Sequence, residues 1–329
     1  MAKYIGKRLV TGILSLFVLA TVTFFLTRVI PGSPFQGANV SESVLQMMEE
    51  EYGLHQPAGV QYVTYMKHLL RGNLGYSYQN PSESVANIIQ RSWPVTAVIG
   101  VLAILLAMIV GIGIGVWQTF SRHRLLRGGL FTGTLLIGGV PNFVAALLLM
   151  LVFGVWLKWL PVSGLDSWKN YILPVCALAL YPACSLARLT GTLLAQEKQR
   201  DYVLLARTKG LKKRQILFTH ILPHIWIPVL NYLGPASAFL LTGSFVVESI
   251  FTIPGLGRQF VSSIANRDYT LILGLTIFMG AVVILIQLAV DLLSACIDPR
   301  VRRSYVYNEE ENTSFEIIPD VCYSISKTN

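Results

Sequence analysis

Charged residues are scarce in this sequence. Only 13% of its 329 residues are Asp, Glu, Lys or Arg, whereas 53% are hydrophobic. A typical soluble domain carries about 25% charged residues. The composition therefore excludes an ordinary water-soluble domain and predicts a membrane protein.

Cysteine is also rare, with four residues in the whole chain. Cys176 and Cys184 are eight positions apart on one expected helix, roughly 12 Å along its axis, which is too far for a disulfide. The four cysteines show no spacing typical of a metal site or a disulfide framework. We interpret them as small apolar residues.

Motifs for nucleotide use and catalysis are missing. The sequence has no Gly-x-x-x-x-Gly-Lys-Ser/Thr phosphate loop, no Gly-x-Ser-x-Gly and no His-Glu-x-x-His. We therefore expect no catalytic residues, no metal and no cofactor bound by this chain. If ATP drives its activity, partner subunits must bind the ATP, and we expect the chain itself not to be an enzyme.

Long apolar runs are the most prominent feature that the sequence does contain. Each is near or above the ~20 residues that cross a bilayer as a helix. The first run is too long for a signal peptide and lacks a clear cleavage site, so we expect it to be retained. The pattern predicts an all-α membrane protein with six transmembrane helices, at about 9–30, 95–118, 129–157, 172–194, 225–247 and 271–297.

These runs divide the chain into four parts. Residues 1–30 form an N-terminal transmembrane helix, 31–94 an extracytoplasmic subdomain, 95–303 the transmembrane core and 304–329 a polar cytoplasmic tail. Within the subdomain, apolar residues recur at helical intervals over 41–52 and 61–70. We expect two short helices there.

Lys and Arg residues are unevenly distributed between the two sides. Placing the N-terminus inside puts seventeen of them on the cytoplasmic side and eight outside, as the positive-inside rule requires. Both termini are then cytoplasmic. The formal charge of +9 arises beside apolar spans, so it indicates contact with membrane lipid and not with nucleic acid.

A basic stretch at 201–223, within the loop 196–224, lies between two of the spans. Asp201 can cap a short helix on which Tyr202, Leu205 and Ala206 share one face. Gly210 can end that helix in a left-handed conformation. A second helix would follow, carrying Ile216, Leu217 and Ile221. Such a pair suits either docking to a soluble partner or packing on lipid headgroups.

The fifth span is interrupted and partly polar. Gly234 and Pro235 interrupt it, and we expect four of its polar side chains to line a pathway: Asn231, Ser237, Thr242 and Ser244. The segment after it, from Glu248 to Tyr269, is either a re-entrant gate or a packed connection. Asp291 in the last span is expected to pair structurally with a basic residue such as Arg188.

Several segments together resemble the permease subunits of bacterial oligopeptide, dipeptide and nickel ABC importers. The coupling loop of ABC importer permeases follows the pattern Glu-Ala-Ala, three residues, Gly, nine residues, Ile, one residue, Leu-Pro. This sequence has Leu204-Leu205-Ala206, Gly210, His220 and Leu222-Pro223 at those places, so it departs at the Glu, the first Ala and the Ile. Other shared segments are Pro31-Gly32-Ser33-Pro34-Phe35, Gly72-Asn73-Leu74-Gly75, Leu233-Gly234-Pro235, Pro254-Gly255-Leu256-Gly257 and Asp298-Pro299-Arg300.

The resemblance covers residues 3–303 and is nearest to the first permease of the oligopeptide system. It implies the type I ABC importer permease fold, an N-terminal helix plus a five-helix core, in the bacterial inner membrane. It also implies a second homologous permease, two cytoplasmic ATPases and an extracytoplasmic peptide-binding protein. The ATPases would dock on a coupling loop whose candidate residues are Asp201, Tyr202, Ala206, Gly210, Leu211, Leu222 and Pro223.

Alternatives remain open. Within the same family, the substrate could be a dipeptide or nickel. Outside it, a secondary transporter would need ion-coupling residues inside the membrane, for which Asp291 is the candidate. A structural membrane protein would not need the interrupted fifth span.

Overall fold

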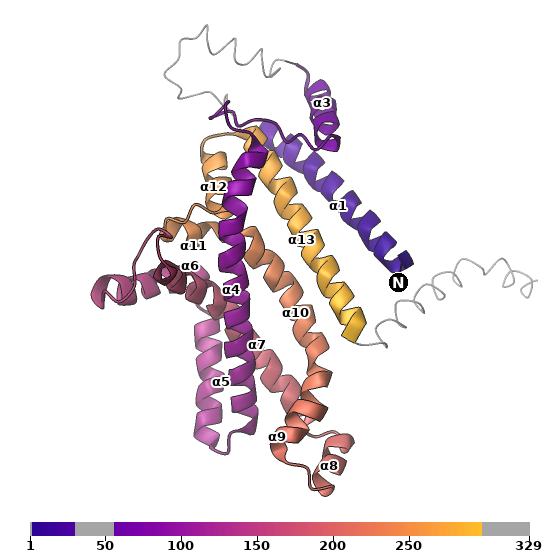
Figure 1. Ribbon diagram of the computed structural model, residues 1–329, viewed down its shortest axis with the longest axis vertical. Helices are drawn as coiled ribbons and strands as arrows, with labels where there is room; N and C mark the ends of the chain where they lie inside the picture. The colour runs from indigo at the N-terminus through magenta and orange to yellow at the C-terminus, as the bar shows by residue number, and fades with distance from the viewer. Residues whose placement is uncertain (1, 30–55, 298–329) are drawn as a thin grey trace, which may run out of the picture.

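The computed structural model describes residues 2–29 and 56–297, and its regular structure over these residues is helical (Figure 1). One isolated antiparallel bridge joins Tyr76 and Ser84. The all-α prediction is confirmed. The elements are α1 (Ala2–Val29), α3 (Ala58–Leu70), α4 (Val85–Phe120), α5 (Arg124–Gly138), α6 (Asn142–Leu149), η1 (Met150–Trp156), η2 (Trp168–Tyr171), α7 (Ile172–Glu197), α8 (Asp201–Thr208), α9 (Lys213–Gln215), η3 (Ile216–Ile221), α10 (Leu222–Thr242), α11 (Phe245–Ile250), α12 (Leu256–Ala265) and α13 (Tyr269–Ile297).

The third expected span, 129–157, is not one straight helix. The chain bends by 101° between α5 and the α6–η1 segment, so that α6 runs roughly horizontally at the upper end of α5 in Figure 1. Gly139 and Val140 separate the two, and Pro141 precedes α6. Because a proline disfavours helical backbone in the residue before it, Val140 is where an apolar run of helical length has to break. The other five expected spans each correspond to a helix long and apolar enough to cross a membrane.

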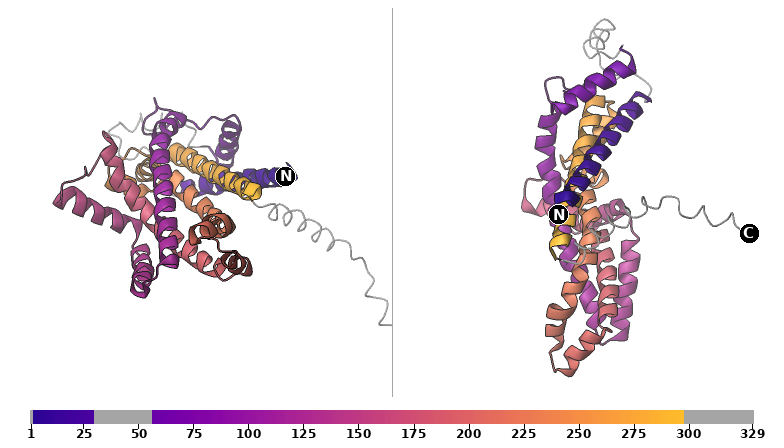
Figure 2. Two further views of the ribbon diagram at one scale, coloured as in Figure 1. Left: turned by 60° about the horizontal axis from the view of Figure 1, so that its bottom comes forward. Right: turned by 90° about the vertical axis from the view of Figure 1, so that its right-hand side faces the viewer.

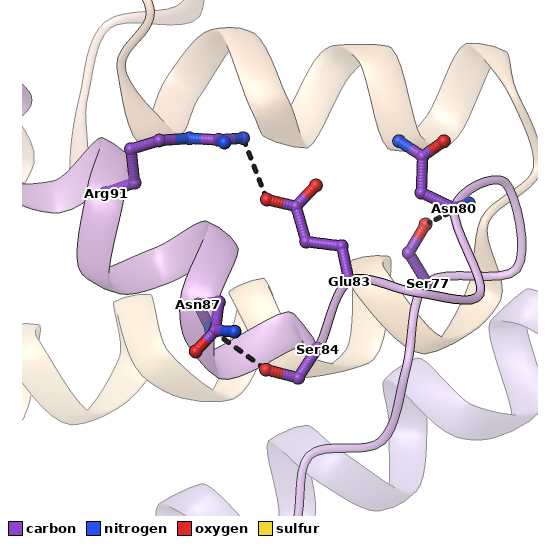
Figure 3. Close-up of polar contacts among 6 residues, drawn as sticks. All are labelled: Ser77, Asn80, Glu83, Ser84, Asn87 and Arg91. Atoms are coloured by element: carbon purple, nitrogen blue, oxygen red, sulfur yellow. Dashed lines mark hydrogen bonds and ion pairs between the residues drawn. The ribbon is translucent and has the colours of Figure 1, made fainter.

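The second span starts earlier than hydropathy predicts. α4 begins at Val85, where the Ser84 hydroxyl accepts a hydrogen bond from the Asn87 amide at 3.3 Å, and it continues through Pro94. Figure 3 shows this start, together with the 3.0 Å ion pair between Arg91 and Glu83. The Ser84 cap, rather than the proline, fixes the beginning of the helix.

Helices α4 and α7 form the central pair of the bundle. Small residues let them approach closely: a Cβ at Gly111 would lie 2.7 Å from the Ala183 carbonyl oxygen, and one at Gly115 would lie 2.8 Å from that of Ala187. Close approach of this kind gives dense packing between membrane helices. The glycines that the sequence places in the second span therefore serve packing at these two positions.

Helices α1 and α13 lie side by side and antiparallel along one flank (Figures 1 and 2). Arg8 and Asp291 form a 3.1 Å ion pair between them. The expected pairing of Asp291 with Arg188 is therefore wrong. Arg188 instead donates to the Thr134 carbonyl oxygen at 3.1 Å, because the α7 turn that carries it packs against α5.

The short helix expected at 61–70 is confirmed as α3, whereas the one expected at 41–52 lies outside the described residues. After α3 the chain turns back towards α13. Asp268, almost fully buried, accepts hydrogen bonds from the Ser77 hydroxyl, from the Tyr78 amide at 3.1 Å and from the Leu271 amide at 3.1 Å. Ser77 also accepts from the Asn80 amide at 3.1 Å, as Figure 3 shows. This carboxylate ties the segment before α4 to the start of α13.

Candidate functional site

The basic stretch between α7 and α10 folds into a tight helical corner at the bottom of Figure 1. Helix α8 ends in a Schellman motif, in which the Gly210 amide donates to the Arg207 carbonyl at 2.9 Å and the Leu211 amide donates to the Ala206 carbonyl at 3.3 Å. Gly210 has φ of +77°, the left-handed conformation that its position predicts. The turn sets the direction of the chain that follows.

A small apolar cluster holds this corner together. Val203 and Ala206 of α8 are buried against Ile216, Leu217 and Ile221 of η3. The three apolar residues expected on the second helix are thus in the cluster. Leu205 was expected beside Ala206 but is 57% exposed, and Val203 takes its place. Positions 203 and 206, three apart, share the face of α8 that packs against η3.

The start of α8 also differs from expectation. Arg200 is the capping residue, and no side chain caps the helix. Asp201 is the first helical residue, where its negative charge still interacts favourably with the helix dipole. The expected Asp201 cap is wrong, since the extended residue that precedes the helix is one position earlier.

Tyr202 fastens α8 to the end of α7. Its hydroxyl donates to a Glu197 carboxylate oxygen at 2.5 Å, and its ring lies 5.2 Å from that of His224. Burial, followed by the hydrogen bond to Glu197, raises the pKa of the Tyr202 hydroxyl. The phenol therefore stays protonated and keeps donating at all physiological pH values.

The outward face of the corner is apolar and basic. Leu204 and Leu205 of α8 and Phe218 of η3 are each more than half exposed. Arg207, Lys209, Lys212 and Arg214 are exposed around them. We call Leu204, Leu205 and Phe218 the exposed ridge. Its apolar side chains sit on a helical corner whose opposite face is fixed by the cluster.

The corner is continuous with the fifth span. Helix η3 runs directly into α10, which begins at Leu222-Pro223. The second short helix is therefore not a separate unit. Pro223 has no amide hydrogen to donate back into η3, and the π-helical turn directly before it is where the continuous helix accommodates this loss. A displacement of the corner would be transmitted along α10.

A cavity of about 700 Å³ opens farther along α10, between α10, α7 and the α5–α6 bend. Tyr181, Tyr232, Phe239 and Pro235 line it, together with Gly138–Asn142 of the bend. Of the four expected pathway residues, Asn231 lines this cavity. Ser237, Thr242 and Ser244 are half-buried and do not, and the Thr242 hydroxyl donates to the Ala238 carbonyl of its own helix at 3.0 Å.

Comparison with known proteins identifies this architecture. Residues 107–303 match the family described as "Binding-protein-dependent transport system inner membrane component", and residues 1–100 match the N-terminal region of such components. The chain belongs to this permease family. It is a multi-pass inner membrane protein and a permease subunit of an ABC importer.

Curated relatives match almost the entire permease. The oligopeptide transport system permease protein OppB of Salmonella typhimurium is 40% identical over 309 residues, which cover 92% of this chain and 100% of the relative. OppB of Escherichia coli K12 is 38% identical with the same coverage. The dipeptide transport system permease protein DppB of Bacillus subtilis is 38% identical over 92% of this chain and 98% of its own.

A solved structure shares the permease fold at lower identity. An inward-facing structure of the MetNI methionine ABC transporter aligns with a TM-score of 0.56 and 16% identity, covering 64% of this chain and 96% of that chain. The type I importer permease fold that the resemblance implies is thus confirmed for the core.

One polar centre of the permease was not anticipated from the sequence. Glu248 in α11 is only 3% exposed and accepts hydrogen bonds from the Thr96 hydroxyl of α4 and from the Arg258 amide of α12, both at 2.9 Å. Thr96 in turn accepts from the Leu256 amide at 2.8 Å. We call these groups the Glu248 knot. In this conformation the knot fastens α11 and α12 to α4.

Proposed function

We propose that this chain is one of two homologous permease subunits in an ABC importer that moves oligopeptides into the cell. Of the two ATPases, one docks on the exposed ridge of this chain and the other on the second permease, and an extracytoplasmic protein delivers the peptide. Seven residues form the coupling segment: Asp201, Tyr202, Ala206, Gly210, Leu211, Leu222 and Pro223. The oligopeptide assignment is supported by the names of relatives that match 92% of the chain.

The single observation that carries the mechanism is the continuity of η3 with α10. The helix that bears part of the exposed ridge at one end lines the 700 Å³ cavity at the other. An ATPase that shifts the ridge would tilt α10 and change the cavity walls, as in alternating access by rocking of helix bundles. Of the four expected pathway residues, Asn231 is the one that lines this cavity.

The same arrangement supports an orientation in the membrane. The N-terminal end of α1 lies beside the end of α13, as the ion pair between Arg8 and Asp291 requires. The helical corner lies at the opposite end of the molecule from α3 (Figure 1). Together with the excess of basic residues around the corner, this supports cytoplasmic termini and an extracytoplasmic α3.

Copurification tests the assembly. The full chain, tagged and extracted gently from its native membrane, should bring with it a second permease and two ATPases, identified by mass spectrometry. A variant carrying both Leu204→Ser and Leu205→Ser should retain the second permease and lose one of the two ATPases, because the apolar ridge of this chain is gone while the second permease is unchanged. Retention of the ATPases at the wild-type ratio would contradict docking on the ridge.

Dipeptide import is the second candidate, because dipeptide permeases match the chain at similar identity. Competition separates the two. Cells that express the importer should take up a labelled pentapeptide, and excess unlabelled pentapeptide should block that uptake more strongly than excess dipeptide. Stronger inhibition by the dipeptide than by the pentapeptide would indicate that dipeptides are the substrate.

A further inference from the structure

Two adjacent cavities open at the end of the bundle that carries α8. One, of about 590 Å³, lies between α4, α5, α7 and α8. The other, of about 660 Å³, lies between α4 and the start of α5 and shares Gln118, Arg127 and Phe131 with the first. Neither contains a residue of the 700 Å³ cavity along α10. We call the 590 Å³ cavity the basic pocket.

The basic pocket concentrates positive charge. Arg127, Arg188, Lys198 and Arg207 line it from three helices and the loop after α7, with amide side chains that include Gln118 and Gln196. Arg124 adds a fifth cation in the adjoining cavity. Among the described residues that line either cavity, none is acidic.

The nearest carboxylate does not neutralise this charge. Glu197 lies next to Lys198 in the sequence, but its carboxylate accepts from the Tyr202 hydroxyl at 2.5 Å and pairs with Arg200 at 3.6 Å. In the described part of the chain, Arg127, Lys198 and Arg207 form no ion pair with an acidic side chain. Cations gathered in a hollow without anions attract an anionic ligand.

Parts of the pocket are held in place. The Arg188 guanidinium donates to the Thr134 carbonyl at 3.1 Å and to the Ser185 hydroxyl at 3.4 Å. The Lys198 ammonium lies 5.4 Å from the centre of the Phe120 ring. These contacts fix two of the four cations before any ligand arrives, which lowers the entropic cost of binding.

Apolar surface adjoins the cations. Leu125, Phe131 and Leu135 of α5 are exposed, as is Trp117 near the end of α4. A hollow rich in Arg and Lys that borders apolar helix faces suits an amphipathic anion: its phosphate fits among the cations and its chains lie along α5. Basic pockets between membrane helices on the cytoplasmic side bind anionic lipid headgroups in this way.

We propose that the basic pocket binds the phosphate of an anionic phospholipid of the cytoplasmic leaflet, with the acyl chains along α5. The proposal goes beyond peptide import, and it rests on the proposed function only for the cytoplasmic placement of α8. Because Arg207 belongs to α8 and Arg127 to α5, a bound phosphate would bridge the coupling segment and the bundle.

Native mass spectrometry of the assembly purified through this chain tests the site. After delipidation, phosphatidylglycerol and phosphatidylcholine of matched chains are added back separately. The wild type should bind phosphatidylglycerol at least about tenfold more tightly, since several basic groups each contribute roughly fivefold near an anionic headgroup. Equal retention of the two lipids would overturn the proposal.

A matched pair of variants locates the binding. Arg127→Gln with Lys198→Gln should weaken phosphatidylglycerol binding about 25-fold, roughly fivefold for each charge removed. Lys212→Gln with Lys213→Gln removes the same charge from exposed positions outside the pocket and should change binding less than about twofold. Equal loss in both pairs would contradict a defined site.

Three further outcomes would show that something other than a phospholipid fills the basic pocket. Inorganic phosphate at millimolar concentration should not displace the lipid, and complete displacement would mean a free-anion site. If the pocket variants instead lose a protein subunit while lipid retention is unchanged, an acidic protein surface fills the pocket. If lipid binds only after removal of residues 304–329, which carry Glu309, Glu310 and Glu311, the tail fills it. Each of these results overturns the lipid site.

A photoactivatable phosphatidylglycerol added to the wild-type assembly keeps the test decisive if a variant folds poorly. Crosslinks should map to residues 124–138. Crosslinks confined to α1 and α13 would contradict the proposal. Because both measurements read lipid retention rather than uptake, failure of the oligopeptide assignment would give a different result from failure of the lipid site.

Discussion

The two ends of the permease are built on different physical principles. At the helical corner, apolar side chains pack on one face and leave the exposed ridge on the other. At the opposite end, the buried carboxylates Glu248 and Asp268 bind hydroxyl and amide groups of neighbouring segments. The first end keeps a surface for a partner, whereas the second satisfies its polar groups internally. Mutations at the two ends should therefore fail in different ways.

The largest expected effect is at the Glu248 knot. Glu248→Ala leaves the Thr96 hydroxyl and the Arg258 amide without their acceptor, which should cost about 3 kcal/mol of stability. Thermal unfolding of the purified assembly in detergent measures the loss. Ser249→Ala, an exposed neighbour on the same helix, is the control and should unfold like the wild type. An unchanged melting temperature for Glu248→Ala would show that the knot is not structural.

A slightly smaller effect is expected in the α4–α7 pair, which packs between the two ends of the permease. A Cβ at Gly111 meets the Ala183 carbonyl oxygen at 2.7 Å, whereas a Cβ at Gly113 meets nothing within 4 Å. Gly111→Ala should destabilise the permease by about 2 kcal/mol through overpacking. Gly113→Ala should be neutral or slightly stabilising, because alanine has the higher helix propensity. Similar melting temperatures for the two variants would contradict close approach of these helices.

At the helical corner, the effect of replacing Gly210 depends on its backbone conformation. Gly210 has φ of +77°, and no atom lies within 4 Å of a Cβ placed there. Gly210→Val should therefore cost about 1–2 kcal/mol through strain alone, while Gly210→Asn, which tolerates this conformation, should cost less. The corner is small, so we expect Val to reduce peptide uptake more than it reduces the amount of folded permease. Equal uptake in Val and Asn variants would argue against a conformational role.

The smallest effect is expected at the contact between α1 and α13. The ion pair between Arg8 and Asp291 joins side chains that are 48% and 20% exposed. Partly exposed pairs contribute about 0–1 kcal/mol, so Asp291→Asn should shift the melting temperature only slightly and leave uptake intact. Complete loss of uptake in a well-folded Asp291→Asn permease would instead support an ion-coupling role for this residue.

Sequence patterns predicted the parts that depend on local physics. Apolar runs gave five of the six spans, and Gly210 was identified from the turn it allows. The bend at Val140 was missed because hydropathy averages over it, although Pro141 was a usable signal. Asp291 was assigned to the wrong partner, and Glu248 was not identified as a packing centre. Those contacts join segments far apart in the chain, so no local pattern specifies them.

Photocrosslinking from Leu205 tests the coupling of the exposed ridge to an ATPase most directly. A benzophenone side chain at position 205 replaces an exposed apolar residue, and Leu285, exposed on α13, serves as the lipid-facing control. Position 205 should crosslink to an ATPase subunit in native membranes, and position 285 should crosslink to lipid. If position 205 also yields only lipid adducts, the corner lies on the headgroups, and docking on the ridge is wrong.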